Sequence, residues 1–314
     1  MEYRRIGRSD LWASEISLGS WLTYGDSLDR EASEACVRRA FDEGINLFDT
    51  ANVYGRGAAE TVLGEVLGPY DRSSYLLATK VFFPMSRTDM GLSPAQVAKQ
   101  CDDSLRRLRT DYLDLYYCHR YDRATPLADT MGALRKLVDQ GKVRHVGFSE
   151  WSPAQVRSAL ELSDLARFVA SQGQYSMLAR GPESELMPLC AASGVSQVVW
   201  SPLAQGVLTG KYRPGAPWPP DSRAGRFKGR PLGGLLRDDV VEAVQRLPAI
   251  AGASGLTMAQ LALAWVLRQE NVASAIVGAT RPEQVSENVR ASGVRLGADV
   301  LAAVDEALDP ALVH

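Results

Sequence analysis

The chain lacks the features that mark several common classes of protein. It has four cysteines that lie far apart, with no CxxC pair and no zinc-ligand spacing. We therefore expect free thiols in a reducing compartment rather than a disulfide framework or a metal site. It has only three histidines, and no motif joins them.

Strong charge and long apolar runs are also missing. The 35 basic and 37 acidic residues leave a formal net charge of −2, which predicts no nucleic-acid partner. Residues 1–8 are polar with no apolar run behind them, so we expect no signal peptide. The most apolar helical stretch, 258–267, is far shorter than the roughly 20 residues that span a bilayer. These features predict a cytoplasmic protein that does not bind membranes, and they leave its oligomeric state open.

The chain does contain a regular alternation of strand and helix patterns. With 314 residues, 46% of them hydrophobic, it can form a large core. Strands are predicted at 16–21, 46–50, 75–81, 113–119, 144–149, 167–174, 197–201 and 274–278. Helices are predicted between and after them at 31–43, 58–67, 93–109, 127–140, 152–163, 184–193, 257–269 and 282–292. This pattern is typical of a parallel α/β fold.

Eight such units favour one (β/α)8 TIM barrel that occupies residues 1–314 as a single domain. We expect a small hairpin from residues 2–6 and 11–14 to plug the N-terminal end of the barrel, and two extra helices at 237–247 and 298–307. A doubly wound sheet is the alternative. A dinucleotide-binding doubly wound fold would be expected to have a GxGxxG turn after the first strand, and Gly19-Ser20-Trp21 is not such a turn.

One connection, at 202–236, is much longer than the others and rich in Gly, Pro and Arg. Long connections in compact domains are commonly functional, often as lids. Because this one follows the seventh predicted strand, we expect it to lie over the mouth of the barrel, where active sites form in this fold.

Polar residues gather where the predicted strands end. They are Trp21, Asp49, Lys80, His119, Ser149, Gln174 and Ser201, and Tyr54 lies on the loop behind Asp49. Each has a simpler explanation: Asp49 could cap the next helix, Lys80 could extend its amine to the surface, and His119 could be a core histidine. Since all would face one rim of a barrel, however, the set favours an active site.

These residue types suit reduction of a carbonyl group. Hydride addition leaves negative charge on oxygen, and that oxygen needs a proton, which the Tyr54 hydroxyl can donate. The Lys80 cation would lower the tyrosine pKa from about 10, and Asp49 would hold Lys80 in place. His119 can donate to the substrate oxygen. No metal is required.

At this point the chain resembles the aldo-keto reductases, in which Asp49, Tyr54, Lys80 and His119 match the catalytic tetrad. The resemblance covers essentially the whole chain, from Tyr3 to about residue 310. It is carried by motifs that include LGSW at 18–21, FDTANVYG at 48–55, DYLDLYYCHR at 111–120, WSPLAQGVLTGKY at 200–212 and IVGATRPEQVSEN at 276–288. The last two look like the branch that contains potassium-channel β subunits and related bacterial reductases.

The resemblance implies NADPH (NADP⁺ when oxidised), bound extended along the barrel mouth without a Rossmann fold. Tyr175 matches the aromatic that commonly stacks on the nicotinamide. At 149–150 this chain has Ser-Glu where many relatives have Ser-Asn, so the resemblance assigns no role to Glu150. The implied cofactor-binding residues are Trp21, Asp49, Ser149, Gln174, Trp200, Ser201, Pro202, Leu203, Ala204, Gln205, Lys211, Arg223, Gly278, Thr280, Gln284, Glu287 and Asn288. The implied substrate residues are Trp21, Tyr54, Phe82 and His119.

Three functions remain in view. The first is reduction of aldehydes and ketones to alcohols with NADPH, acting on a small carbonyl substrate that the sequence does not name. The second is a redox-sensing accessory subunit that holds NADPH and regulates a partner. His119 weighs against it, because channel-type relatives are expected to carry Asn there, and so does the chain's start three residues before the hairpin. The third, a barrel lyase or hydrolase, leaves Arg223 and the 284–288 set unexplained.

Overall fold

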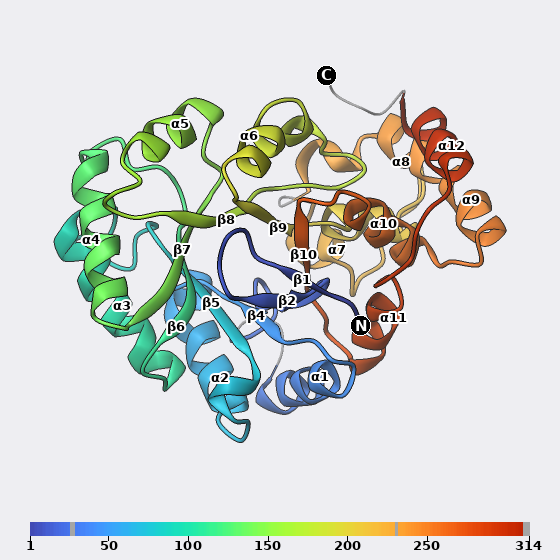
Figure 1. The fold of residues 1–314 in the computed structure, drawn as a ribbon. Coiled ribbons are helices and arrows are strands. Elements are labelled where there is room, and N and C mark those ends of the chain that lie inside the picture. Colours follow the sequence, from blue (N-terminus) through green and yellow to red (C-terminus); the bar gives the residue numbers. More distant parts are fainter. Residues whose placement is uncertain (26–28, 230–231, 310–314) are drawn as a thin grey trace.

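Eight parallel strands close into a barrel, in the order β10-β3-β4-β5-β6-β7-β8-β9. The structure is a computed structural model that describes residues 1–25, 29–229 and 232–309 (Figure 1). The barrel strands are β3 (Ile16–Gly19), β4 (Leu47–Asp49), β5 (Leu76–Val81), β6 (Leu113–Cys118), β7 (Val143–Ser149), β8 (Phe168–Gln172), β9 (Ser196–Trp200) and β10 (Val272–Val277). The predicted (β/α)8 barrel is confirmed, and only the ends of its strands differ from those expected.

The helices lie outside the strands, as the predicted pattern requires. Those of the eight strand–helix units are α1 (Arg30–Asp42), α2 (Ala58–Leu67), α3 (Pro94–Leu108), α4 (Leu127–Asp139), α5 (Pro153–Glu161), α6 (Leu186–Ala192), α10 (Met258–Leu267) and α11 (Pro282–Val289). Ser93 and Ser152 cap the proline-initiated helices α3 and α5 through their hydroxyl groups. Gly44 and Gly141 follow helices with φ of 82° and 71°, a left-handed conformation that glycine adopts without strain.

A hairpin closes one end of the barrel. Its strands β1 (Tyr3–Arg5) and β2 (Trp12–Ser14) pair antiparallel, and Figure 1 shows it across the barrel. Ile6, Leu11 and Ala13 of this hairpin are buried in a cluster with Leu47 and Leu76, which begin β4 and β5. The hairpin therefore fills the N-terminal end of the strands, as predicted, and leaves the C-terminal rim for the site.

The helices outside the eight units are more numerous than predicted. Instead of one helix at 237–247, the described residues form α8 (Asp238–Val244) and α9 (Leu247–Ala253). Pro248 lies in the first turn of α9, and its missing N–H favours a new helix there over continuation of the first. The final helix, α12 (Ala298–Leu308), lies where it was expected.

The long connection at 202–236 also contains short helical segments that its composition did not indicate. It forms the 3-10 segments η4 (Ala204–Thr209) and η5 (Gly233–Leu236) and the helix α7 (Arg223–Phe227), which Ser222 caps. Residues 230–231 of this connection, and residues 310–314 of the predicted domain, lie outside the described residues.

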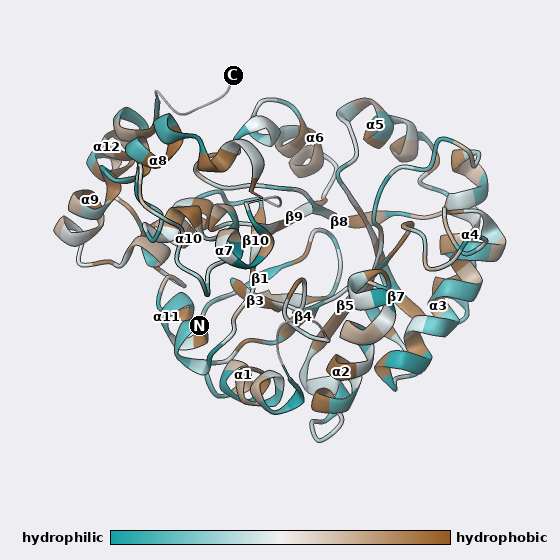
Figure 2. Ribbon diagram, turned by 180° about the vertical axis from the view of Figure 1, so that it is seen from behind, coloured by the Kyte–Doolittle hydropathy of each residue, from teal (hydrophilic) through white to brown (hydrophobic). Residues whose placement is uncertain are grey.

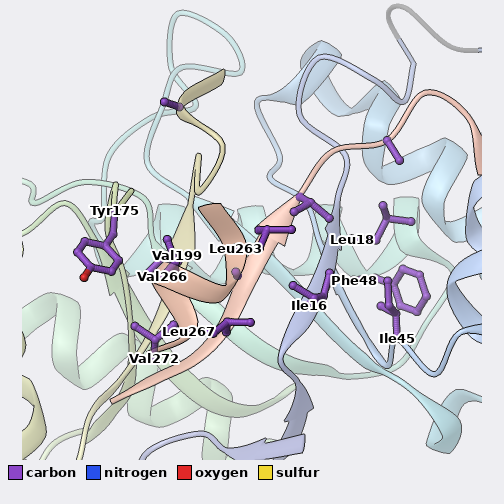
Figure 3. Close-up of a cluster of buried hydrophobic side chains, with 14 of the residues drawn as sticks. Ile16, Leu18, Ile45, Phe48, Tyr175, Val199, Leu263, Val266, Leu267 and Val272 are labelled. Carbon is purple, nitrogen blue, oxygen red and sulfur yellow. The ribbon is translucent and has the colours of Figure 1, made fainter. Parts of the chain in front are cut away.

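The main core lies between the strands and the helices. Figure 3 shows Leu263, Val266 and Leu267 of α10 beside β9 and β10, in the same cluster as Ile16 and Phe48. Figure 2 shows α10 as largely hydrophobic, which fits its nearly complete burial.

Within the described residues, no single helix is long and apolar enough to cross a membrane. The segments Asp238–Ala253 and Met258–Leu267 meet that criterion only as a pair bent by 88°.

Candidate active site

A buried ion pair lies at the C-terminal ends of two neighbouring strands. Lys80 Nζ of β5 is 2.5 Å from Asp49 Oδ1 of β4 and donates to the carbonyl oxygen of Thr50 at 2.6 Å. From β8, Gln172 Nε2 donates to the second carboxylate oxygen of Asp49 at 2.9 Å. Burial alone would lower the pKa of Lys80, but the Asp49 carboxylate and the Tyr54 hydroxyl favour the cation, so the pKa is raised. Lys80 is therefore held charged and in one place.

Tyr54 lies beside this pair. Lys80 Nζ is 5.1 Å from the centre of the Tyr54 ring. Burial raises the pKa of Tyr54 above its ordinary value, and the Lys80 cation opposes this shift without cancelling it. The predicted lowering by Lys80 is thus one contribution, but burial outweighs it. Tyr54 consequently remains protonated at neutral pH, as a proton donor must.

His119, the residue after β6, completes the group. Its ring packs edge-on against Tyr54, with 5.9 Å between ring centres. Burial, together with the cations of Lys80 and Arg120, holds the pKa of His119 well below its usual range. Its Nδ1 is buried and has no hydrogen-bond partner among the described residues. A neutral imidazole beside Tyr54 can orient a carbonyl oxygen without adding a charge.

These groups border a cavity of about 1110 Å³ that runs along the rim to β10 and α11. Of the residues predicted to bind cofactor or substrate, those that line it are Trp21, Asp49, Tyr54, His119, Ser149, Trp200, Ser201, Pro202, Leu203, Gln205, Lys211, Arg223, Gly278, Thr280, Gln284, Glu287 and Asn288. Lys80 lies beneath the cavity, bonded to Asp49. The structure thus brings together residues from nearly the whole length of the chain, from Trp21 to Asn288.

Four expectations do not match this lining. Gln174 lies outside it, because β8 ends at Gln172 and it is Gln172 that lines the cavity. Tyr175 is buried elsewhere, and its hydroxyl contacts Glu183 and accepts from Arg268.

Ala204 is buried behind the lining, and Phe82 packs against the hydrophobic core while the adjacent Phe83 lines the cavity. β5 ends at Val81 and the chain bends at Phe83, so the alternation of the strand does not carry on to these two residues.

Glu150 has a contact that the sequence did not indicate. Its Oε1 accepts from the indole Nε1 of Trp200 at 2.8 Å and from the backbone N–H of Gln174 at 2.7 Å. Glu150 does not line the cavity, whereas Trp200 does and lies edge-on to Trp21, with ring centres 6.4 Å apart. Glu150 therefore fixes the orientation of a cavity-lining ring from outside the cavity.

This contact makes a prediction. We expect Glu150→Ala to weaken NADPH binding by about three- to tenfold, because the Trp200 ring loses a charge-assisted hydrogen bond and becomes free to turn. Glu150→Gln keeps an acceptor oxygen and should stay within about twofold of the parent. Fluorescence titration measures both, and equal losses in the two variants would show that the charge of Glu150 matters rather than its bond to Trp200.

One wall of the cavity carries an excess of positive charge. Partial removal from water lowers the pKa of Lys211; Asp221 opposes this shift, while Arg223 and Arg281 add to it. Burial likewise lowers the pKa of Arg223, whose guanidinium carbon lies 5.0 Å from the centre of the Trp21 ring. Cations that crowd one wall in this way are stabilised by a bound polyanion, so the wall suits the phosphates of the implied dinucleotide.

The loop that borders this wall is strained. Ser201, Ala204 and Gln205 adopt left-handed backbone conformations with φ of 54°, 45° and 56°. Such conformations cost a non-glycine residue roughly 1–2 kcal/mol each and cluster in ligand-binding loops. Gln205 Oε1 is also buried without a hydrogen-bond partner among the described residues. Strain and an unpaired polar atom both fit a loop that holds a ligand such as a dinucleotide.

A parallel barrel with this set of residues at its rim defines a class of oxidoreductases. A model of the aldo/keto reductase family matches residues 15–309, and the chain belongs to that family. Membership supports, in general terms, NADPH-dependent reduction of carbonyl compounds.

Two plant proteins illustrate the branch. A protein of Arabidopsis thaliana named "Probable voltage-gated potassium channel subunit beta" is 39% identical over 302 residues, which cover 94% of this chain and 92% of the relative. A protein of Oryza sativa subsp. japonica with the same name is 38% identical over 302 residues, with the same coverage of both chains. The expected resemblance to this branch is therefore confirmed.

Proposed function

We propose that the protein reduces aldehydes or ketones to alcohols with NADPH, as a single domain in the cytoplasm. The observation that carries the proposal is the group of Asp49, Lys80 and Tyr54 beside neutral His119, at the floor of a cavity of which one wall is cationic. Bound NADPH would supply the hydride. The residues that would hold it are the cavity-lining members of the predicted set, with Gln172 in place of Gln174.

The chain's own residues account for the proton and for the orientation of the substrate. Tyr54 stays protonated because of burial, and donates its proton to the oxygen that receives negative charge. Lys80 stabilises the tyrosinate left behind, and Asp49 holds the Lys80 cation in reach. His119 donates to the same oxygen and directs it toward Tyr54. Ser149, Trp200 and Gln172 line the cavity near these groups.

The direct test is to mix purified protein, NADPH and a simple aromatic aldehyde. The NADPH absorbance band should disappear at a rate proportional to protein, with one alcohol formed for each NADPH consumed. Binding of NADPH without any turnover over a panel of aldehydes and ketones would contradict the proposal.

The names of these relatives favour a second candidate, an accessory subunit of a potassium channel. In this candidate the protein would hold NADPH without reducing carbonyl compounds. Binding without turnover is the outcome that this candidate predicts. The two functions are therefore separated by the same measurement.

The cationic wall predicts a preference for NADPH over NADH. The two cofactors differ by the 2′-phosphate, which a charge-assisted contact from Arg223 or Arg281 would stabilise by roughly 1.5–3 kcal/mol, about one to two decades of affinity. We expect Arg223→Ala to lower kcat/KM for NADPH about 10- to 100-fold and to change that for NADH much less. Arg213→Ala, at an exposed position of the same connection outside the lining, is the control. Equal losses with both cofactors would show that Arg223 does not read the 2′-phosphate.

A further inference from the structure

The cavity contains a cation that the proposed cofactor site does not use. Lys211, Arg223 and Arg281 form one wall, to which the proposal assigns the phosphates. Arg120 also lines the cavity, and it follows His119 at the rim end of β6. Its position is thus beside the reacting groups.

The contacts of Arg120 hold its side chain without neutralising it. Its Nη1 donates to the carbonyl oxygen of His119 at 2.6 Å and, at a longer 3.5 Å, to Ser149 Oγ. Its guanidinium carbon lies 5.3 Å from the centre of the Phe83 ring. Among the residues that the structure describes, no carboxylate forms an ion pair with Arg120, and Nε and Nη2 have no hydrogen-bond partner. A planar donor fork is therefore fixed at the cavity with its charge available.

Arg120 is close enough to act on a molecule that reaches Tyr54 and His119. The Phe83 ring packs edge-on to His119 with 4.8 Å between centres, so Phe83 contacts both the His119 ring and the guanidinium. The Arg120 charge also acts on both groups: it adds to the lowering of the His119 pKa and opposes the rise that burial causes in the Tyr54 pKa. A carbonyl compound with its oxygen at Tyr54 would place the rest of the molecule along Phe83, toward Arg120.

A purely structural role explains only part of this arrangement. The bonds from Arg120 to His119 and Ser149 join the ends of β6 and β7, and a neutral donor would serve that purpose equally well. A guanidinium that keeps its charge and two free donor groups at the cavity is placed to bind an anionic group.

Resting on the proposed reductase function, we propose that Arg120 makes the site selective for carbonyl substrates that also carry an anionic group, a carboxylate or a phosphate. Guanidinium binds both groups through paired hydrogen bonds.

The test compares anionic and neutral forms of one aldehyde. The substrates are 2-, 3- and 4-carboxybenzaldehyde with their methyl esters, so that the position of the charge varies around one ring. For the best-placed acid, we expect kcat/KM to exceed that of its ester by at least about tenfold. Arg120→Met should lower kcat/KM for that acid about 10- to 100-fold and for its ester by less than about threefold. Arg120→Lys keeps the charge but not the planar guanidinium, so its kcat/KM for that acid should lie between the values of the parent and of Arg120→Met.

A second comparison, between a phosphate and a carboxylate substrate, shows which kind of anion the site prefers. 4-Formylphenyl phosphate is compared with 4-carboxybenzaldehyde in the parent and in Arg120→Met, and the substrate with the larger loss identifies the group that the site prefers. Arg123→Met, which removes an exposed arginine outside the lining, should leave all these values unchanged. NADP⁺ binding, followed by fluorescence, should be the same in Arg120→Met as in the parent.

The outcomes distinguish this inference from the proposed function. If the parent reduces the esters as well as the acids, and Arg120→Met changes both alike, the inference is wrong and the reductase function stands. If no substrate is reduced, the proposed function itself fails. A loss of NADP⁺ binding in Arg120→Met would instead assign Arg120 to the cofactor site, and would also overturn the inference.

Discussion

Tyr54→Phe is expected to lower turnover by at least about 100-fold while NADPH still binds. The substitution removes only the hydroxyl that donates the proton, and a positioned general acid contributes roughly 10²- to 10⁴-fold. The ring remains, so its edge-on contact with His119 and its packing near Trp21 should survive. Steady-state kinetics gives the loss of turnover, and fluorescence titration gives the retained binding.

Tyr24→Phe is the matched control for this experiment. Tyr24 is a second tyrosine in the cavity lining, and its buried hydroxyl has no hydrogen-bond partner among the described residues. We expect it to stay within about twofold of the parent. A Tyr54→Phe protein that keeps full turnover would remove Tyr54 as the acid, and an equal loss in Tyr24→Phe would point to general damage of the cavity.

The same hydroxyl sets the expected pH dependence of reduction. The reaction needs Tyr54 protonated, and burial raises its pKa, so the protonated form persists beyond the ordinary value of about 10. His119 stays neutral because its pKa is held well below its usual range. We therefore expect kcat/KM to be flat from about pH 6 to 10, without a break near the ordinary histidine value of about 6.5, and a break there would mean that His119 titrates.

The barrel could be predicted because every level of the sequence agreed on it. The strand patterns, the Ser-Pro helix starts at Ser93 and Ser152, and the closing glycines each indicated the same alternation, and within the eight strand–helix units only the ends of elements moved. That Asp49, Lys80 and His119 lie at one rim could also be predicted, since strand ends in a parallel barrel meet there whatever the details of packing.

What could not be predicted depends on contacts between distant parts of the chain. Gln172 and Gln174 are two residues apart, so in an extended strand their side chains would point to the same face. Only the position at which β8 ends decides which of them reaches the rim. The Tyr175 hydroxyl accepts a hydrogen bond from Arg268, which lies 93 residues further along the chain. Trp200 meets Glu150 across 50 residues. No local sequence pattern specifies contacts between residues so far apart in the chain. Secondary-structure propensity and motifs alone therefore could not assign the roles of Tyr175 and Glu150.

Lys80→Met is expected to damage both stability and turnover, and the two effects can be separated. The substitution leaves the Asp49 carboxylate buried without its cation, and breaking a buried ion pair in this way costs about 3–5 kcal/mol of unfolding free energy. It also removes the charge that stabilises the tyrosinate of Tyr54, so we expect turnover to fall by at least about 100-fold. Urea unfolding measures the first effect and steady-state kinetics the second.

The double variant Lys80→Met/Asp49→Asn separates the two roles. The asparagine side chain carries no charge and can still accept a hydrogen bond from Gln172. Replacing both partners of a buried ion pair often changes the free energy of unfolding little, so most of the lost stability should return. Turnover should not return, since nothing then stabilises the charge on Tyr54. Recovery of both would mean that Lys80 serves only to neutralise Asp49. A single Lys80→Met variant as stable as the parent would show instead that Asp49 does not need its partner, and that the pair exists for the chemistry of Tyr54 alone.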